Sequence, residues 1–311
     1  MASLHATRRL NTVWVVAAPS ARVPFQSVQS SSSSGRRNPC ARAVAGDEDE
    51  DAPTDPGKPT RVERLLANLG YGKRRECQQL VKQGRVLSGG QRVRVGDKVL
   101  QSEVTCDGEP LDPASPLVVL LHKPVGYVVT SPSDEGVADA TVYDLLPHRY
   151  SQRRPMLTAV GRLDKDTSGL LILTDDGHLV QRIKSPRSAV FKVYEAKLNQ
   201  PMTTAQAAAA AKRFASGSFT LTGDLSPLLP AKLTRLDDHR VTVAVCEGRY
   251  HQVRRMLAAV GHDVVRLHRS QVGGLTLGEL AEGEWCSLTD SDLDLLFSSP
   301  VADQEPNSVQ H

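Results

Sequence analysis

The sequence has few of the residues that cross-link small secreted or metal-bound domains. Its five cysteines are widely separated and include no C-x-x-C pair, which argues against a disulfide scaffold and a zinc ribbon. No apolar run approaches the roughly 20 residues of a membrane-spanning helix, so we expect no membrane partner. The 311 residues, 40% apolar and 23% charged, instead fit a soluble chain of about two domains.

The first 46 residues contain no lysine and no acid, but six arginines and eight serines. This composition is typical of an organelle transit peptide; a basic tail that touches nucleic acid is the alternative. The serine cluster at 30–34 favours a plastid over a mitochondrion. An acidic run, DEDED, begins a predicted linker over 47–59, and a disordered tail is expected over 298–311. Without residues 1–46 the chain carries 32 basic against 35 acidic residues, so the partner must be inferred from where the charges lie.

A small basic and helical block follows. Nine basic residues stand against two acids between Arg61 and Val95. Apolar residues at i, i+3, i+4 and i+7 from Val62 predict a helix with one buried face, and a second helix is expected over 73–83. The first turn of the second helix carries three cations, Lys73, Arg74 and Arg75. Because the helix dipole disfavours cations there, we interpret them as a phosphate-binding surface; an ordinary solvated face is the alternative.

The block from residue 116 to 297 alternates strand-like and helical segments, and its loops carry charge. Buried strands are predicted at 117–124, 156–160 and 170–174. Between the last two lies the loop GRLDKDTSG, in which cationic neighbours would keep the carboxylate of Asp164 ionised. We expect Asp176 to cap a helix over 178–184.

The segment EGRYHQVRRMLAAVG (247–261) predicts a further helix. Its apolar stripe is formed by Val253, Met256, Leu257 and Val260. Arg254 falls at the edge of that stripe, where it can reach an interior carboxylate. Arg255 points nearly opposite, where it can reach phosphate. Four histidines lack metal-ligand spacing and are interpreted as structural: His122, His178, His251 and His262.

Four motifs together resemble the pseudouridine synthase family: HKPVGYVVT, GRLDKDTSGLLILTDDG, FKVYEAKL and EGRYHQVRRM. The resemblance covers roughly residues 60–295 and is strongest to the RsuA/RluB-like ribosomal RNA branch. That branch carries an N-terminal alpha-L RNA-binding domain, which the stretch RVERLLANLGYGKRRECQQLVKQGRVLSGGQRVRVGD resembles.

The resemblance implies an α+β fold. We expect a mostly antiparallel catalytic domain over 116–297, preceded by an alpha-L domain over 60–112. The implied reaction is isomerisation of a specific, flipped-out uridine to pseudouridine in organellar ribosomal RNA. It requires neither cofactor nor metal, and we expect a monomer that acts on pre-ribosomal particles.

The resemblance also assigns roles to individual residues. Asp164 matches the essential aspartate beside the ribose, and Arg254 matches the arginine that pairs with it. Whether Asp164 attacks the sugar or removes a sugar proton to give a glycal stays open, with the glycal route favoured by the family. Tyr194 matches the tyrosine that stacks on the base, and Arg162 the arginine that fills the gap left by the flipped nucleotide. Lys123 and Pro124 match the element that shapes the pocket.

Two other functions compete with this interpretation. The first is a ribosome-assembly RNA-binding protein whose synthase fold is not used for catalysis. The second is a glycosidase-like hydrolase, against which the sequence offers no second catalytic acid. Asp164 alone would suit a structural turn, and Tyr194 would suit the core face of a strand.

Overall fold

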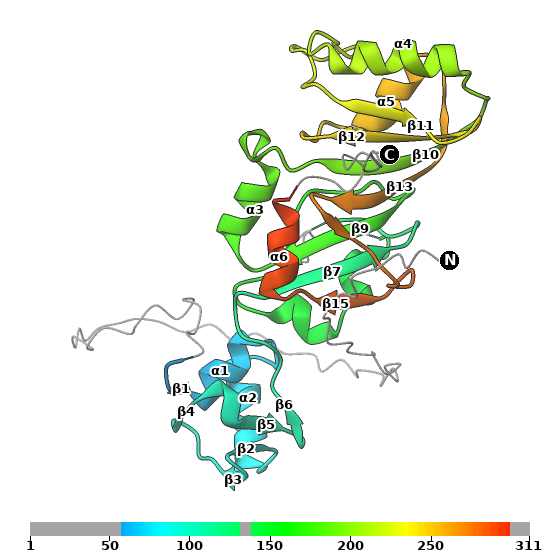
Figure 1. Cartoon of the computed structure of the whole chain (residues 1–311). Coiled ribbons are helices and arrows are strands. Elements are labelled where there is room, and N and C mark those ends of the chain that lie inside the picture. The colour runs from blue at the N-terminus through cyan, green and yellow to red at the C-terminus, as the bar shows by residue number, and fades with distance from the viewer. Residues whose placement is uncertain (1–56, 131–137, 299–311) are drawn as a thin grey trace, which may run out of the picture.

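In the computed structural model the described residues are 57–130 and 138–298 (Figure 1). The predicted transit segment 1–46 lies outside them, as do most of the predicted linker 47–59 and all of the tail after residue 298. Within the described ranges, no helix has the length and apolar character needed to cross a membrane.

The N-terminal domain packs two helices on small strands. Its elements are β1 (Thr60–Arg61), α1 (Val62–Asn68), α2 (Arg74–Lys82), β2 (Val86–Ser88), β3 (Gln91–Arg92), β4 (Lys98–Val99), β5 (Val104–Cys106) and β6 (Glu109–Pro110). The apolar faces of α1 and α2 form one core with β2, β4 and β5. The carboxylate of Glu76 accepts a bond of 2.7 Å from the backbone N–H of Lys73, so an acid caps the basic first turn of α2.

The catalytic-domain region is built on one large sheet. Its strands are β7 (Val118–Lys123), β8 (Thr158–Ala159), β9 (Thr167–Thr174), β10 (Lys192–Leu198), β11 (Lys232–Arg235), β12 (Arg240–Val245), β13 (Val264–Val272), β14 (Leu275–Thr276) and β15 (Trp285–Ser287). The order is β11-β12-β10-β13-β9-β7-β15, with β14 on β13 and β8 on β9. Among the described strands only β9 and β13 pair in parallel. The predicted α+β, mostly antiparallel architecture is confirmed.

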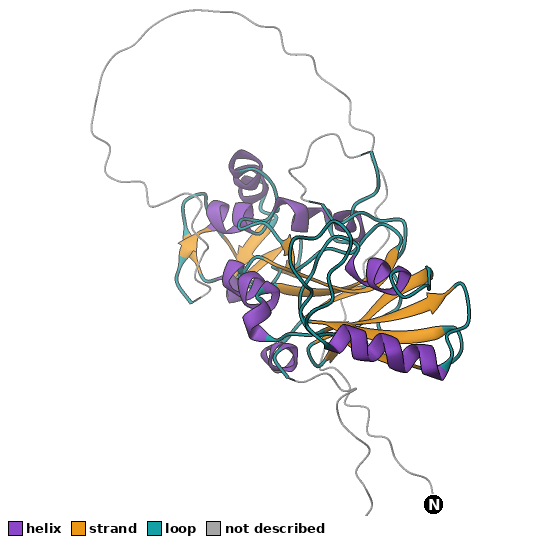
Figure 2. Cartoon of the chain, turned by 90° about the horizontal axis from the view of Figure 1, so that it is seen from above, coloured by secondary structure: helices purple, strands orange, loops and turns teal. Residues whose placement is uncertain are grey.

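Helices cover both faces of this sheet (Figure 2). They are α3 (Gly177–Lys184), α4 (Thr204–Ala215), α5 (Gln252–Ala258) and α6 (Asp290–Leu296). On one face, α4 and α5 form a core with β10 to β13, and 3-10 turns at 142–152 form a second core with β7 and β9. Tyr194 packs against both of these cores. On the other face, α3 and α6 cover alternate residues of β7 and β9.

Local chemistry sets the ends of two helices. The predicted cap of α3 is confirmed, because Asp176 accepts hydrogen bonds from the N–H groups of His178 and Leu179. The helical stripe predicted from Val253 lies on α5, which begins at Gln252. His251 before it has φ +48°, a left-handed conformation that cannot continue a helix backward, so residues 249–251 form a turn instead.

Gly169 brings β9 close to β13. It has φ +115°, and a Cβ placed on it would lie only 2.3 Å from the carbonyl oxygen of Arg269. Glycine is therefore required where β9 and β13 run side by side. The loop 161–167 that leads into β9 is held beside Arg269 by this approach.

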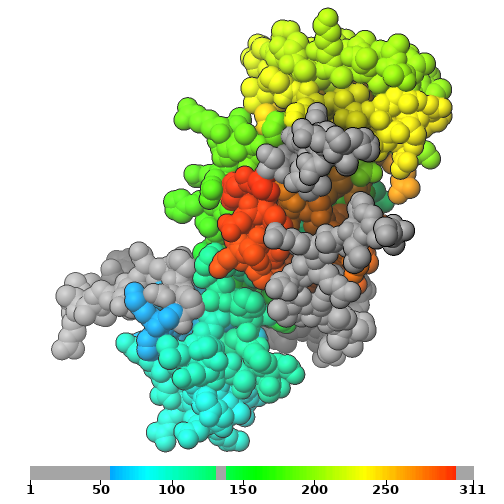
Figure 3. All heavy atoms as spheres, viewed as in Figure 1, coloured from blue at the N-terminus to red at the C-terminus, as the bar shows by residue number. Residues whose placement is uncertain are grey.

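The two domains form separate lobes that touch along one seam (Figure 3). Arg149 makes a bidentate ion pair with Asp112, and its guanidinium lies 5.8 Å from the centre of the Tyr71 ring. The backbone N–H of Arg154 donates to the carbonyl of Asn68 at 2.8 Å. Gly70, at φ +85°, permits this contact, because a Cβ there would collide with the carbonyl oxygen of Arg149.

Candidate active site

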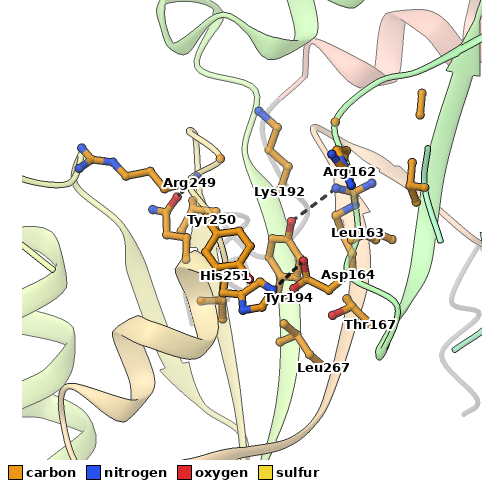
Figure 4. Close-up of a pocket in the computed structure, with 18 of the residues that line it drawn as sticks. Arg162, Leu163, Asp164, Thr167, Lys192, Tyr194, Arg249, Tyr250, His251 and Leu267 are labelled. Atoms are coloured by element: carbon orange, nitrogen blue, oxygen red, sulfur yellow. Dashed lines mark hydrogen bonds and ion pairs between the residues drawn. The ribbon is translucent and has the colours of Figure 1, made fainter. Parts of the chain in front are cut away.

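A cavity of about 600 Å³ opens where the two cores on one sheet face meet (Figure 4). Its walls come from the loop 159–167, the end of α3, β10, the turn 247–253 and β13. The volume lies within the range of small-ligand pockets, so one nucleoside can enter. Tyr194 and Asp164 both line it.

Lys123 holds the loop that carries Asp164. The side chain is fully buried, and its ammonium donates to the carbonyls of Pro124 at 2.9 Å, Asp164 at 3.1 Å and Thr167 at 2.8 Å. A fourth carbonyl, that of Lys165, lies at 3.5 Å. Burial lowers the pKa of Lys123 to about 8. The lysine predicted to shape the pocket thus lies behind the loop and binds its backbone.

The carboxylate of Asp164 is reachable from the cavity. Its side chain is 33% exposed, and Oδ1 lies 3.5 Å from Nε2 of His251. The His251 ring stacks on Tyr250, with centroids 3.9 Å apart, and the side chain of Tyr250 is open to solvent. Figure 4 shows this aromatic pair beside Asp164. A left-handed backbone at a non-glycine residue is uncommon, and here it aims the imidazole at the carboxylate.

Tyr194 and Arg269 also line the cavity. They are register partners on β10 and β13, which puts their side chains on the same face. Nη1 of Arg269 donates to the Tyr194 hydroxyl at 3.4 Å, and Nε donates to the carbonyl of Leu170 at 2.7 Å. Figure 4 places Tyr194 next to Asp164, as the sequence predicted.

The predicted ion pair between Arg254 and Asp164 is wrong. Arg254 binds Asp166 instead, with Nη2 to Oδ2 at 2.8 Å and Nη2 to the backbone oxygen at 3.3 Å. Nη1 also donates to the carbonyl of Val264 at 3.1 Å. The cause lies in the loop: Lys123 fixes its backbone so that Asp164 lines the cavity and Asp166 meets α5 and the start of β13. Arg254 therefore anchors the loop two residues away from the predicted partner.

Arg255 is bound within the protein, and its predicted contact with phosphate stays a prediction. Its guanidinium donates to Asp224 at 2.6 Å and to the carbonyls of Thr222 at 2.7 Å and Tyr250 at 3.2 Å. Arg249 contacts the same carboxylate at 2.9 Å, and hydrogen bonds from both arginines lower the pKa of Asp224. The helical wheel placed Arg255 on the outer face but could not show that the loop at 222–227 covers it.

The other predicted RNA-binding residues lie at the surface. Arg162 is exposed at the wall of the cavity. Lys73, Arg74 and Arg75 are exposed at the beginning of α2, in the N-terminal domain. Their contacts with RNA stay predictions.

Sequence reasoning missed three polar residues of the cavity: Lys192, His251 and Arg269. The ammonium of Lys192 donates to the carbonyls of Ile183 at 3.2 Å and Cys246 at 3.4 Å. Burial, with the nearby charge of Arg269, lowers the pKa of Lys192 to about 8. Only strand register brings Arg269 to Tyr194, and no spacing in the sequence reveals it. His251 stood in a quoted motif but was interpreted as structural.

No cluster of three or more potential metal ligands occurs among the described residues. Asp164, a tyrosine and several cations line the open cavity, and a small basic helical domain precedes it. This combination defines an enzyme that acts on nucleic acid.

The chain belongs to the RNA pseudouridine synthase family. Residues 117–259 match the RNA pseudouridylate synthase family, and residues 60–105 match the S4 domain, so the predicted family and enzyme class are confirmed. A ribosomal small subunit pseudouridine synthase A from Pasteurella multocida (strain Pm70) is 37% identical over 237 residues, 75% of this chain and 97% of the relative. The enzyme of the same name from Escherichia coli (strain K12) is 36% identical over 237 residues, 75% of this chain and 98% of the relative.

A solved structure gives the same result. The crystal structure of a pseudouridylate synthase is 34% identical and superimposes with a TM-score of 0.52. The match covers 76% of this chain and 99% of that chain. The two-domain arrangement of this family is therefore present across the described residues.

Proposed function

We propose that this enzyme isomerises a specific uridine to pseudouridine in organellar ribosomal RNA, with Asp164 as the residue that acts at the ribose. The observation that carries the proposal is the Asp164 carboxylate, one-third exposed and lining, together with Tyr194, a cavity of nucleoside size. Two relatives that align with this chain over nearly their full length are named ribosomal small subunit pseudouridine synthase A. Their name supports ribosomal RNA as the substrate.

The reaction requires the bond between C1′ and N1 to break, which leaves the sugar electron-poor. An ionised carboxylate beside the ribose stabilises that centre, by attack at C1′ or by removal of a C2′ proton. The Tyr194 ring offers a stacking surface for the base. A paired uridine hides its glycosidic bond within the helix, so the target must be flipped into the cavity, and exposed Arg162 at the wall is placed to fill the gap.

The N-terminal domain supplies the RNA affinity in this proposal. Lys73, Arg74 and Arg75 are exposed on α2, where they attract phosphates, and the enzyme acts as a monomer on pre-ribosomal particles. The composition of residues 1–46 supports import into an organelle, with a plastid favoured by its serine cluster.

A tritium-release assay tests the catalytic assignment. Small-subunit ribosomal RNA of the organelle is transcribed with tritium at C5 of uridine, and release is compared for wild type, Asp164→Asn and the control Asp263→Asn. Asp263 is an exposed aspartate before β13, outside the cavity. We expect Asp164→Asn to lose at least about a thousandfold in kcat, because the neutral amide cannot act on the sugar.

Two results would contradict the proposal in different ways. Equal release by Asp164→Asn and wild type would remove Asp164 from the chemistry. Tight RNA binding by the wild type without release would favour the non-catalytic assembly protein on this substrate. Mapping of pseudouridines in organellar RNA from cells that lack the protein then identifies the modified uridine.

A further inference from the structure

Arg269 is a buried cation, and one of its guanidinium nitrogens makes no hydrogen bond to the described residues. Its side chain is 3% exposed, and its bonds to Leu170 and Tyr194 use Nε and Nη1. Nη2 has no acceptor among the described residues, although the atom itself is buried. A buried guanidinium N–H without a partner costs free energy, so its presence needs an explanation.

The unpaired group lies at the wall of the cavity that holds Asp164. Thr167, 1% exposed and also lining this cavity, has a hydroxyl without a partner among the described residues. Two residues that line one cavity, Arg269 and Thr167, thus each carry a buried polar atom without a partner among the described residues. Tyr194 lies directly beside Arg269, so a base stacked on the tyrosine has its edge within reach of the guanidinium.

The nearby charges indicate what kind of ligand group Arg269 accepts. The guanidinium carries a permanent positive charge and can only donate. A second cation, Lys192, also lines the cavity and lies on β10, the strand of Tyr194, whereas Asp164 is a carboxylate of the same cavity. Near the two cations the cavity is thus suited to negative charge on a ligand, and near Asp164 to positive charge.

We propose that Arg269 is a catalytic residue that binds a carbonyl oxygen of the detached uracil and stabilises its negative charge. This inference rests on the proposed function. When the C1′–N1 bond breaks, its electron pair goes to uracil, which becomes an anion delocalised over N1 and the carbonyl oxygens. The electron-poor sugar either bonds to Asp164 at C1′ or gives Asp164 its C2′ proton. That step is reversed before the base rejoins the sugar.

The remaining reaction steps rearrange uridine without gain or loss of atoms. The uracil turns while it is held by the Arg269 donors, and C5 forms the new bond to C1′. The proton on C5 is then lost, and N1 takes up one proton, so the net reaction is an isomerisation. A donor placed where charge develops in the reaction accelerates bond cleavage more than it strengthens substrate binding.

The test compares Arg269→Met and Arg269→Lys with wild type and with Arg266→Met, an exposed arginine on the same strand. Loss of one preorganised donor lowers kcat by about 100- to 1000-fold. We expect that loss for Arg269→Met, with the Kd for RNA changed by less than about threefold. Arg269→Lys keeps the charge and should recover about tenfold, while Arg266→Met behaves as wild type.

A second substrate separates catalysis from a structural role. Fluorine at C5 withdraws electrons, so 5-fluorouracil is the better leaving group. Single-turnover loss of the target nucleoside is followed for RNA with uridine and with 5-fluorouridine. If Arg269 stabilises the departing base, the defect of Arg269→Met is several-fold smaller on the fluorinated RNA. A merely structural role lowers both rates by the same factor.

Each outcome bears on one proposal. Equal defects on the two RNAs, or an unchanged kcat, overturn the role of Arg269 while wild-type turnover upholds the proposed function. No turnover by wild type overturns the proposed function itself. If Arg269→Met does not fold, the two-substrate comparison is made with Arg269→Lys, for which equal defects again overturn the inference.

Discussion

Replacement of Lys123 by Met should weaken the fold and catalysis together. The change removes the donor of four loop carbonyls, three of them within 3.1 Å. Hydrogen bonds from a charged group contribute about 1.5 to 3 kcal/mol each, and the relieved burial of the ammonium offsets part of that. We expect a net loss of about 3 kcal/mol in the free energy of unfolding, or about 6 to 12 °C in Tm for a chain of this size.

The pH dependence of this loss gives a sharper measurement. Burial lowers the pKa of Lys123 in the folded chain from 10.5 to about 8. Between these two values the unfolded chain holds more protons than the folded one, so this group adds stability as pH rises through that window. The full gain is about 3 kcal/mol. Stability measured against pH should therefore rise more steeply between pH 8 and 10 for wild type than for Lys123→Met.

Chemical denaturation at several pH values, with the tritium-release rate at pH 7.5, provides both readouts. Lys212→Met is the control, because this lysine of α4 is exposed and lies outside the cavity. Equal pH slopes for wild type and Lys123→Met would refute the assigned pKa. A stability loss below about 1 kcal/mol with unchanged turnover would refute the role of Lys123 as the support of the loop.

Two further predictions concern RNA binding. Lys73, Arg74 and Arg75 changed together to Ala should weaken RNA affinity and reduce the slope of log K against log salt by about 2, measured by filter binding at several salt concentrations; an unchanged slope would exclude this surface. Tyr250→Ala should raise the Kd for RNA by about tenfold, because its exposed ring at the cavity mouth offers a stacking surface for a base, and leave Tm within about 2 °C; an unaltered Kd would remove Tyr250 from the interface.

Local patterns in the sequence predicted much of this fold. The i, i+3, i+4, i+7 spacing from Val62 gave helix α1, and Asp176 marked the beginning of α3. The quoted motifs pointed to Asp164 and Tyr194, and both line the cavity. These features depend on neighbours within a few residues, so the sequence carries them directly.

Long-range geometry could not be predicted in the same way. Arg254 and Asp164 are 90 residues apart, and which aspartate of the loop meets α5 depends on how Lys123 turns the backbone. The bond of Arg255 to Asp224 could not be predicted, because the loop at 222–227 has no periodic pattern. Arg269 reaches Tyr194 only through the pairing of β10 with β13, which no spacing in the sequence encodes.

The contact between the two lobes bears on which uridines can reach the active site. The Arg149–Asp112 pair and the bond between Arg154 and Asn68 join the small domain to the large one, and so oppose changes in the distance from α2 to Asp164. If an RNA binds α2, only uridines at the distance that separates α2 from Asp164 can enter the cavity. Selection of the target thus depends on the three-dimensional shape of the RNA as well as on the bases around the uridine.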